Sequence, residues 1–194
     1  MKTYLNIFLF LGFSSNGLPA EANGANLYNK NSVKSGKLKS LVVFAHFPEE
    51  DALVGKLPPS FAKDLFRSEL SGSLTHFYSE MSQGQLTLDG EVLPRRISVS
   101  NPRDSYTEPV GSYRGFVKEI IDVLDRDIDL ALYDNDGPDG QPNSGDDDGY
   151  LDFLFIVTHS VPEGFILGSA TGVARLGLKN DYRSNDSSAE GGNV

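Results

Sequence analysis

The sequence predicts a layered α/β or α+β domain, in which a mixed sheet packs against helices. The main observation is the order of its patterns, because strand, helix, strand, helix and strand follow one another along the chain. A second observation is that the last strand-like run directly follows a loop dense in aspartate. Because that apolar run must be buried, it attaches the charged loop to a folded core.

The first strand is predicted at 41–45, a run of β-branched and aromatic residues that reads Leu-Val-Val-Phe-Ala. An acidic loop is expected to follow it over 48–59. A helix is then predicted from apolar residues at helical spacing, with Ser73 as a candidate N-cap and Gly84 just beyond its end. These apolar positions are Leu70, Leu74, Phe77, Tyr78 and Met81.

A second strand is predicted over 85–93, because apolar and polar residues alternate there. Gly90 lies inside this run, which suggests a bulge or a turn. The clearest helix follows, with Ser112 as a candidate N-cap, and a third strand is predicted over 151–158. The apolar residues of that helix repeat at i, i+3, i+4, i+7 and i+11, at Val117, Ile120, Ile121, Leu124 and Ile128.

The loop between this helix and the third strand carries most of the charge. Seven aspartates fall between Asp134 and Asp152. No lysine or arginine occurs between Arg126 and Arg175, and the nine Asp and one Glu of that span equal the chain's net charge of -10. Carboxylates this close repel one another unless water or a cation screens them. The loop is therefore a candidate cation site.

The ligands in this loop favour calcium. Carboxylates, asparagine side chains and backbone carbonyls are hard oxygen donors, and the chain has no cysteine to compete with them. The spacing is not that of an EF-hand, because counting from Asp134 puts Pro138 and Asp139 where that motif needs an acid or asparagine and a glycine. A solvated acidic loop is the alternative interpretation, since Asp, Gly, Pro and Asn are also common turn residues.

The amino terminus predicts an exported protein. Residues 1–22 have the layout of a signal peptide, with Lys2, an apolar run and small residues at Ala20 and Ala22. The alternative is that the apolar run forms an amino-terminal core strand. The run is too short to span a membrane, and no later segment approaches about 20 apolar residues. Residues 23–37 are rich in Asn, Gly, Ser and Lys and are expected to form an extended spacer.

Composition limits the partners and the sources of stability. A sequence pI near 4.7 and the lack of a basic patch argue against nucleic acid as a partner. Without cysteine the chain has no disulfides, so bound calcium could supply the cross-linking that a secreted domain needs. Residues 179–194 form a polar tail rich in Ser, Asn and Gly.

No catalytic signature is complete in the sequence. The three histidines lie far apart, at 46, 76 and 159, and none belongs to a His-Glu-x-x-His zinc motif. There is no Gly-x-Ser-x-Gly elbow and no thiol nucleophile, and the adjacent Glu49 and Glu50 do not identify a glycosidase. His159 follows a buried strand and could lie near a site, although a polar strand end is the commoner explanation. No catalytic residue is predicted.

Three segments resemble the secreted zinc metalloproteases of the immune inhibitor A type. They are the run 41–48, which ends in Phe-Pro, the segment 73–86 with its aromatic pair, glutamate and Gly-Gln-Leu, and the Asp-rich stretch 133–152. The resemblance implies that 38–178 is the amino-terminal part of a zincin-like catalytic domain. In that family a downstream helix carrying His-Glu-x-x-His binds zinc. This sequence ends before any such motif, so no zinc ligand or catalytic glutamate is assigned.

The resemblance also implies ligands, a cofactor and substrates. Zinc is expected for the complete family domain, and extracellular proteins or peptides are its expected substrates. The predicted function is that of a secreted metallopeptidase, represented by a chain that lacks the zinc helix and is inactive alone. The alternative is a non-catalytic secreted calcium-binding or adhesive module, which would more commonly show several Asp-Gly repeats than one acidic loop. The candidate calcium ligands are Asp134, Asp136, Asp146, Asp148 and Asp152.

Overall fold

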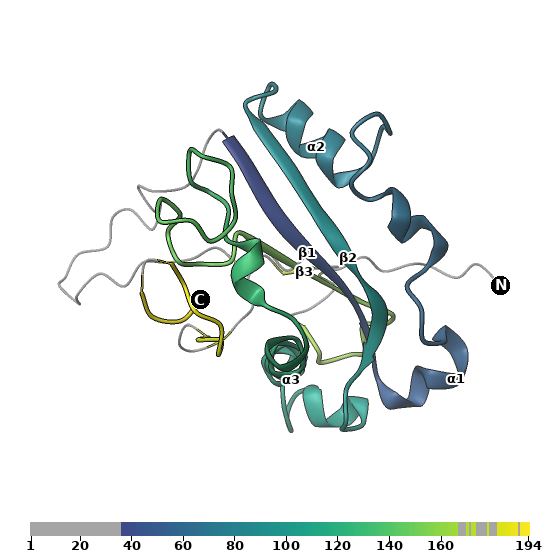
Figure 1. The fold of residues 1–194 in the computed structure, drawn as a ribbon. Helices are drawn as coiled ribbons and strands as arrows, with labels where there is room; N and C mark the ends of the chain where they lie inside the picture. Colours follow the sequence, from purple (N-terminus) through teal and green to yellow (C-terminus); the bar gives the residue numbers. More distant parts are fainter. Residues whose placement is uncertain (1–35, 167–169, 171, 174–177, 179–181, 190) are drawn as a thin grey trace, which may run out of the picture.

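A three-stranded parallel sheet forms the centre of the fold. The computed structural model describes residues 36–166, 170, 172, 173, 178, 182–189 and 191–194. The strands are β1 (Gly36–His46), β2 (Leu86–Ser98) and β3 (Phe153–Thr158), in the order β2-β1-β3 (Figure 1). Both strand pairings are parallel, so the α/β class is confirmed, whereas the sheet predicted as mixed is parallel throughout its described strands.

Parallel strands need long crossover connections, and both connections between strands of this sheet contain helices. The first connection carries α1 (Asp51–Val54) and α2 (Leu74–Met81), and the second carries α3 (Tyr113–Asp127). Short 3₁₀ helices complete these connections and the start of the acidic loop. They are η1 (Pro48–Glu50), η2 (Ser60–Asp64), η3 (Arg103–Tyr106) and η4 (Leu130–Tyr133).

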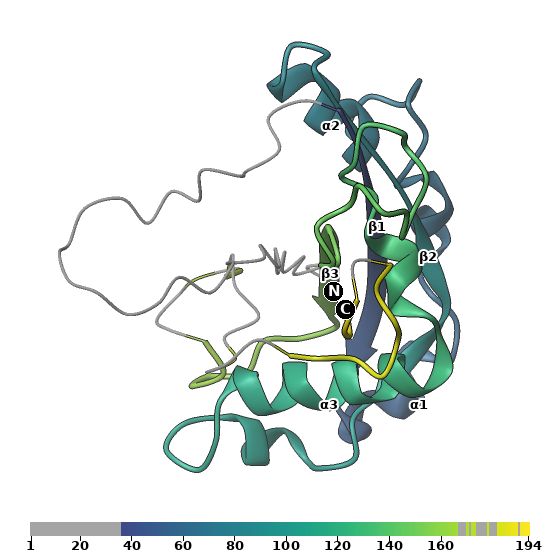
Figure 2. The ribbon, with the colours of Figure 1, turned by 60° about the vertical axis from the view of Figure 1, so that its left-hand side comes forward.

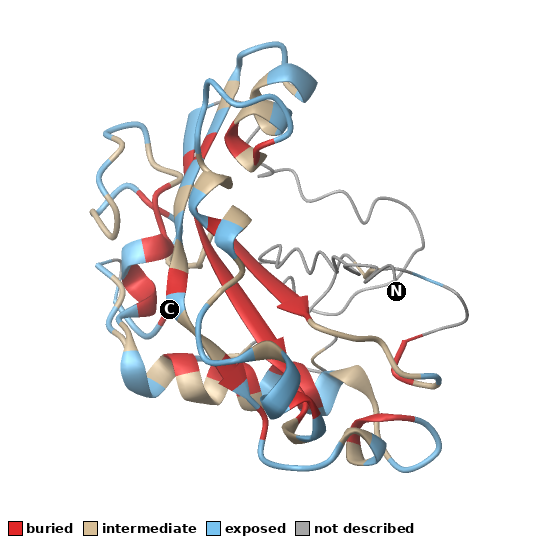
Figure 3. Ribbon diagram, turned by 90° about the vertical axis from the view of Figure 1, so that its right-hand side faces the viewer, coloured by how far each residue is buried: buried red, intermediate tan, exposed pale blue. Residues whose placement is uncertain are grey.

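The two faces of the sheet bury different helices, as the alternation of side chains along a strand requires. On one face, Leu41 and Val43 of β1 pack with the apolar residues of α3. On the other face, Val42 and Phe44 pack with residues of η2 and α2. Figures 1 and 2 show the two helical layers, and Figure 3 shows the buried stretches of the central strands in red. β1 is buried throughout 40–46. β3 is buried at all six positions.

Several predicted elements are confirmed with different bounds. The strand predicted at 41–45 begins five residues earlier, so β1 includes the last two residues of the predicted spacer 23–37. The rest of that spacer and the predicted signal peptide 1–22 lie outside the described residues, as does part of the tail 179–194. The helix predicted around 117–128 and the strand predicted at 151–158 correspond to α3 and β3.

The segment 48–59 is not the simple acidic loop that was predicted. It begins with η1 and α1, because the Glu50 carboxylate accepts a hydrogen bond from the backbone N–H of Phe47 at 3.1 Å and closes a turn. The Glu50 side chain is buried, and the hydroxyl of Ser160 donates to its other oxygen. A glutamate in an acidic stretch therefore links the segments that follow β1 and β3.

Gly90 forms neither the bulge nor the turn that was predicted, because it pairs in register with Ser40 inside β2. A Cβ atom at this position would lie 2.2 Å from the carbonyl oxygen of Ser40, so glycine is required by the close approach of β2 to β1. The irregularity of this pairing lies further along, where the register shifts between Val42 and Phe44 of β1. β2 itself continues to Ser98, five residues beyond the predicted end.

Ser73 caps α2, as the sequence predicted. Its hydroxyl accepts a hydrogen bond from the N–H of His76 at 3.1 Å and donates one to the carbonyl of Arg67 at 2.7 Å. We expect Ser73→Ala to lower the free energy of unfolding by about 1–2 kcal/mol, because it removes an N-cap from a buried position. Urea denaturation measures the change. The control is Ser79→Ala, inside the same helix, and an equal loss in both variants would contradict the capping role.

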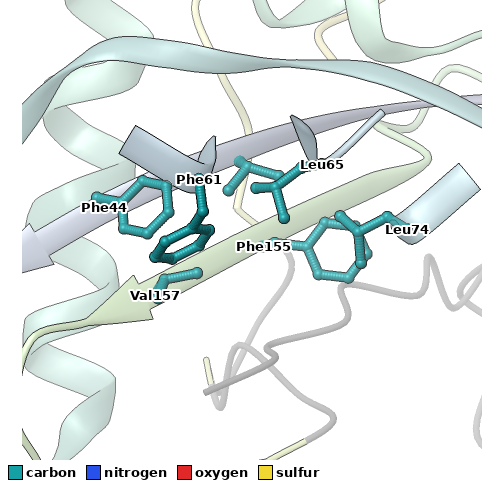
Figure 4. Close-up of a pocket in the computed structure, with 7 residues that line it drawn as sticks. Phe44, Phe61, Leu65, Leu74, Phe155 and Val157 are labelled. Atoms are coloured by element: carbon teal, nitrogen blue, oxygen red, sulfur yellow. The ribbon is translucent and has the colours of Figure 1, made fainter. Parts of the chain in front are cut away.

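A small apolar cavity lies between the sheet, η2 and α2 (Figure 4). Its volume is about 40 Å³, and no polar side chain lines it. A void of this size holds little more than one water molecule and offers that water no hydrogen-bond partner. The cavity is therefore a packing feature of the core and does not provide a ligand site. Its lining residues are Val42, Phe44, Phe61, Leu65, Leu74, Phe155 and Val157.

Candidate metal centre

The acidic loop is closed at its base by backbone contacts to the sheet. It leaves η4 at Asp134 and enters β3 after Asp152, whose N–H donates to the carbonyl of Tyr133 at 2.7 Å. The Asp152 carboxylate also accepts a hydrogen bond from the N–H of Lys39 in β1 at 2.7 Å. The two ends of the loop therefore meet beside the amino-terminal half of β1.

Three carboxylates gather at this base. One carboxylate oxygen from each of Asp134, Asp136 and Asp152 lies within 4.8 Å of the other two. Calcium binds oxygen at about 2.3–2.6 Å, so oxygens separated by up to about 5 Å can share one ion. In the part of the chain that the structure describes, no other group of three potential His, Asp or Glu ligands lies this close together.

Asp134 provides the second indication of a cation site. Its side chain is fully buried, and only one of its carboxylate oxygens has a partner, the N–H of Gly149 at 3.0 Å. The other oxygen, Oδ1, is buried and accepts no hydrogen bond. Leaving a buried acceptor unsatisfied costs about 1–3 kcal/mol, and more for a charged group. A bound cation would remove this cost, because it would supply the missing partner.

Burial and neighbouring negative charges raise the pKa values of the three carboxyl groups. Burial, together with the charges of Asp147, Asp148 and Asp136, raises the pKa of Asp134 to about 7. Burial and the neighbouring Asp136 and Asp134 raise the pKa of Asp152 to about 8, although the bond from Lys39 opposes this. Burial also raises the pKa of Asp136. Among the described residues, no ion pair involves any of the three.

The structure places the other two predicted ligands outside this group of three. Asp146 is exposed, and its carboxylate accepts hydrogen bonds from the Asp139 N–H and the Ser144 hydroxyl. Asp148 is exposed as well, and its carboxylate accepts a hydrogen bond from the N–H of Tyr150 at 3.1 Å. These two aspartates therefore shape the rim of the loop, and a role for them as calcium ligands stays a prediction.

Asp147 is a residue that orders the loop beside the site, and sequence reasoning missed it. It is buried, and its two oxygens accept hydrogen bonds from the N–H groups of Gly137 and Ser144, each at 2.7 Å. The carboxylate thus holds the two halves of the loop together beside the three clustered aspartates. Nothing in the run 146–148, which reads Asp-Asp-Asp, distinguishes the inward-facing member from its two neighbours.

No family model and no curated protein matches this chain. The geometry of the cluster indicates which ions it can bind. Three carboxylates with a buried unpartnered oxygen are hard ligands, which suit calcium or magnesium and not a soft metal. Calcium takes six to eight oxygen ligands, so backbone carbonyls or water would complete the coordination.

A separate polar cluster lies at the opposite, carboxyl-terminal edge of the sheet. His46 at the end of β1 contacts Asp51 with its Nε2 atom at 2.8 Å, and the hydroxyl of Ser98 at the end of β2 donates to the same carboxylate oxygen. The bond from Ser98, followed by the bond from His46, lowers the pKa of Asp51. His46 Nδ1 is buried and without a partner. These contacts join the ends of two strands to α1.

Proposed function

We propose that this protein binds a calcium ion through Asp134, Asp136 and Asp152, and that the ion stabilises the fold. The observation that carries the proposal is that Asp134, whose buried Oδ1 has no partner, belongs to a cluster of three carboxylates. Calcium is favoured over magnesium because an irregular, glycine-rich loop suits an ion that tolerates irregular geometry. The ion would also offset two of the negative charges in the part of the chain that carries the excess.

The position of the cluster supports a structural role for the ion. In open α/β sheets, ligands and substrates bind beyond the carboxyl ends of the strands. The three aspartates lie instead near the start of β1 and β3, where Asp152 bonds to the backbone of Lys39. An ion at this place would hold the loop against the sheet, in a chain that has no disulfide to do so.

Thermal unfolding tests the calcium proposal. We expect the melting temperature of the purified chain to rise when excess chelator is replaced by millimolar calcium, because an ion that binds only the folded state stabilises it by mass action. For calcium at about 100 times its dissociation constant the gain is about 2.7 kcal/mol. Magnesium at the same concentration is the control and should give a smaller shift. An unchanged melting temperature in calcium would refute the proposal.

A second candidate function is that of a secreted zinc metallopeptidase, for which this chain would supply part of the catalytic domain. The observation that favours it is that the three segments of the resemblance meet around one sheet. They include the second half of β1, α2 with the first residue of β2, and the acidic loop that leads into β3. Zinc, the extracellular location and protein or peptide substrates belong to this proposal. No helix within the described residues is long and apolar enough to cross a membrane.

The metallopeptidase proposal predicts that the 194-residue chain alone does not hydrolyse casein, with or without added zinc. The reason is that its three histidines do not form a His-Glu-x-x-His motif. Release of soluble peptides from labelled casein measures this activity, with a zinc chelator as the control. Hydrolysis that depends on zinc would show that the ligands lie elsewhere in these residues.

A further inference from the structure

The tail of the chain returns to the acidic loop, where two of its residues bond to Asn143. The side-chain amide of Asn143 donates to the carbonyl of Ser187 at 3.1 Å, and its side-chain oxygen accepts from the N–H of Ala189 at 2.7 Å. Two bonds from one planar amide fix both the position and the direction of the tail segment. Figure 1 shows the tail, in yellow, beside the green acidic loop.

Asn143 is also bonded to a proposed calcium ligand. Its backbone N–H donates to the carbonyl oxygen of Asp134 at 2.7 Å. Its φ angle is 51°, in the left-handed region that asparagine tolerates better than most residues. The orientation of the Asn143 side chain therefore depends on the position of the Asp134 backbone, which a bound ion would hold.

The preceding part of the tail is anchored elsewhere. The N–H of Asn185 donates to the carboxylate of Asp125 in α3 at 2.6 Å. The Asp186 carboxylate accepts from the N–H of Leu130 in η4 at 2.8 Å. These contacts hold the tail on the helical layer without using any residue of the acidic loop, so the two anchors can be separated experimentally.

A further feature of this region is the space between the tail and the loop. A hollow of about 340 Å³ lies between them, lined by loop residues 148–150 and by tail residues that include Tyr182, Arg183 and Ser188. Ser187 and Ala189 are exposed. The two bonds to Asn143 therefore anchor the exposed residues Ser187 and Ala189 on the loop.

We propose that calcium occupancy of the Asp134, Asp136 and Asp152 cluster controls the docking of tail residues 187–189 on Asn143. This inference rests on the proposed calcium function and adds a regulated element to it. Without the ion, mutual repulsion of the carboxylates broadens the conformations of the loop, and ordering Asn143 for the tail then costs conformational entropy. With the ion bound, the loop is already ordered, so docking of the tail costs less conformational entropy. By linkage, docking of the tail strengthens calcium binding by the same factor.

Hydrogen exchange of single amides, followed by NMR on the full chain, tests this coupling. Calcium in place of chelator should slow exchange at the Ala189 N–H by at least about fivefold, the lower end of typical coupling energies. The Asn185 N–H, bonded to Asp125, should change less. In Asn143→Ala, the calcium effect at Ala189 should disappear, and calorimetry should show calcium affinity reduced by the same factor. In the matched variant Asp125→Ala, tail exchange should be faster in both conditions while its calcium dependence remains.

The outcomes separate the two proposals. If calorimetry detects no calcium binding to the unaltered chain, the proposed function fails, and the tail coupling fails with it. If calcium binds but exchange at Ala189 is the same with chelator, the calcium site stands and the coupling is overturned. A calcium effect at Ala189 that persists in Asn143→Ala would also overturn it, because the signal would not pass through the Asn143 amide.

Discussion

Replacing Asp134 with asparagine is expected to weaken calcium binding by about 100-fold or more. Substitution of a residue that only supports a metal ligand typically costs 10–100-fold, and Asp134 is proposed to contact the ion directly. The variant keeps the shape of the side chain and an oxygen that can accept from the N–H of Gly149. The loss would therefore come from the missing charge and not from a collapsed loop. Isothermal calorimetry measures the affinity.

The same substitution should have the opposite effect when calcium is absent. It places a neutral amide at a crowded, fully buried position, where the pKa of the natural carboxyl is raised to about 7. At pH 8 in chelator, Asp134→Asn should therefore be more stable than the unaltered chain, because it removes a buried charge that lacks a partner. In millimolar calcium the order should reverse. This change of sign distinguishes a metal ligand from a residue that matters only for packing.

Asp139→Asn is the matched control for this prediction. Asp139 belongs to the same loop and carries the same charge, but it is exposed and lies outside the cluster of three. Its substitution should change calcium affinity only slightly, through the long-range field of the loop, and salt should screen that change. Equal losses of affinity in the two variants would mean that calcium responds to the total charge of the loop and has no specific site.

Stability of the calcium-free protein should fall as the pH rises from about 5 to about 8. The folded-state pKa values of Asp134, at about 7, and Asp152, at about 8, lie above the unfolded value near 4. Between these limits the folded chain binds more protons than the unfolded chain. The stability that these protons contribute is fully present below the unfolded pKa and is lost as the pH rises through the folded pKa. The slope is on the order of 1 kcal/mol per pH unit.

Urea denaturation at a series of pH values in chelator measures this slope. Calcium should flatten or reverse it, because the ion binds the deprotonated carboxylates and its affinity rises with pH. Asp134→Asn should show a shallower slope in chelator, since one of the two groups responsible has been removed. A stability that rises with pH over this range in chelator would contradict the account of buried, unpaired carboxylates.

Local pattern predicted much of this fold. The apolar periodicity of α3, the β-branched run in β1 and the capping hydroxyl of Ser73 are properties of neighbouring residues, and these elements form where such patterns place them. The length of β2 depends instead on its place in the sheet. Pro94 argues against a strand, yet it is accommodated in β2, which has only one neighbour in the described sheet and shifts register near this point.

The sequence predicted the loop and included all three clustered aspartates among its five candidate ligands, but it did not separate them from Asp146 and Asp148. Composition identifies the stretch that collects negative charge, while the grouping of Asp134 and Asp136 with Asp152 depends on contacts between distant residues. The bond from the Lys39 N–H to Asp152 spans 113 residues, and it places that carboxylate beside the start of the loop. The inward position of Asp147 likewise depends on hydrogen bonds that its carboxylate accepts from backbone N–H groups of the loop. Only the folded chain brings these groups together.

The most direct test of the central claim is a crystal structure from crystals grown in calcium, with anomalous difference density measured for the ion. The account predicts a peak within about 2.3–2.6 Å of one oxygen each from Asp134, Asp136 and Asp152, including Oδ1 of Asp134. An ion bound only at the exposed Asp146 and Asp148, or a well-ordered cluster without any peak, would contradict it.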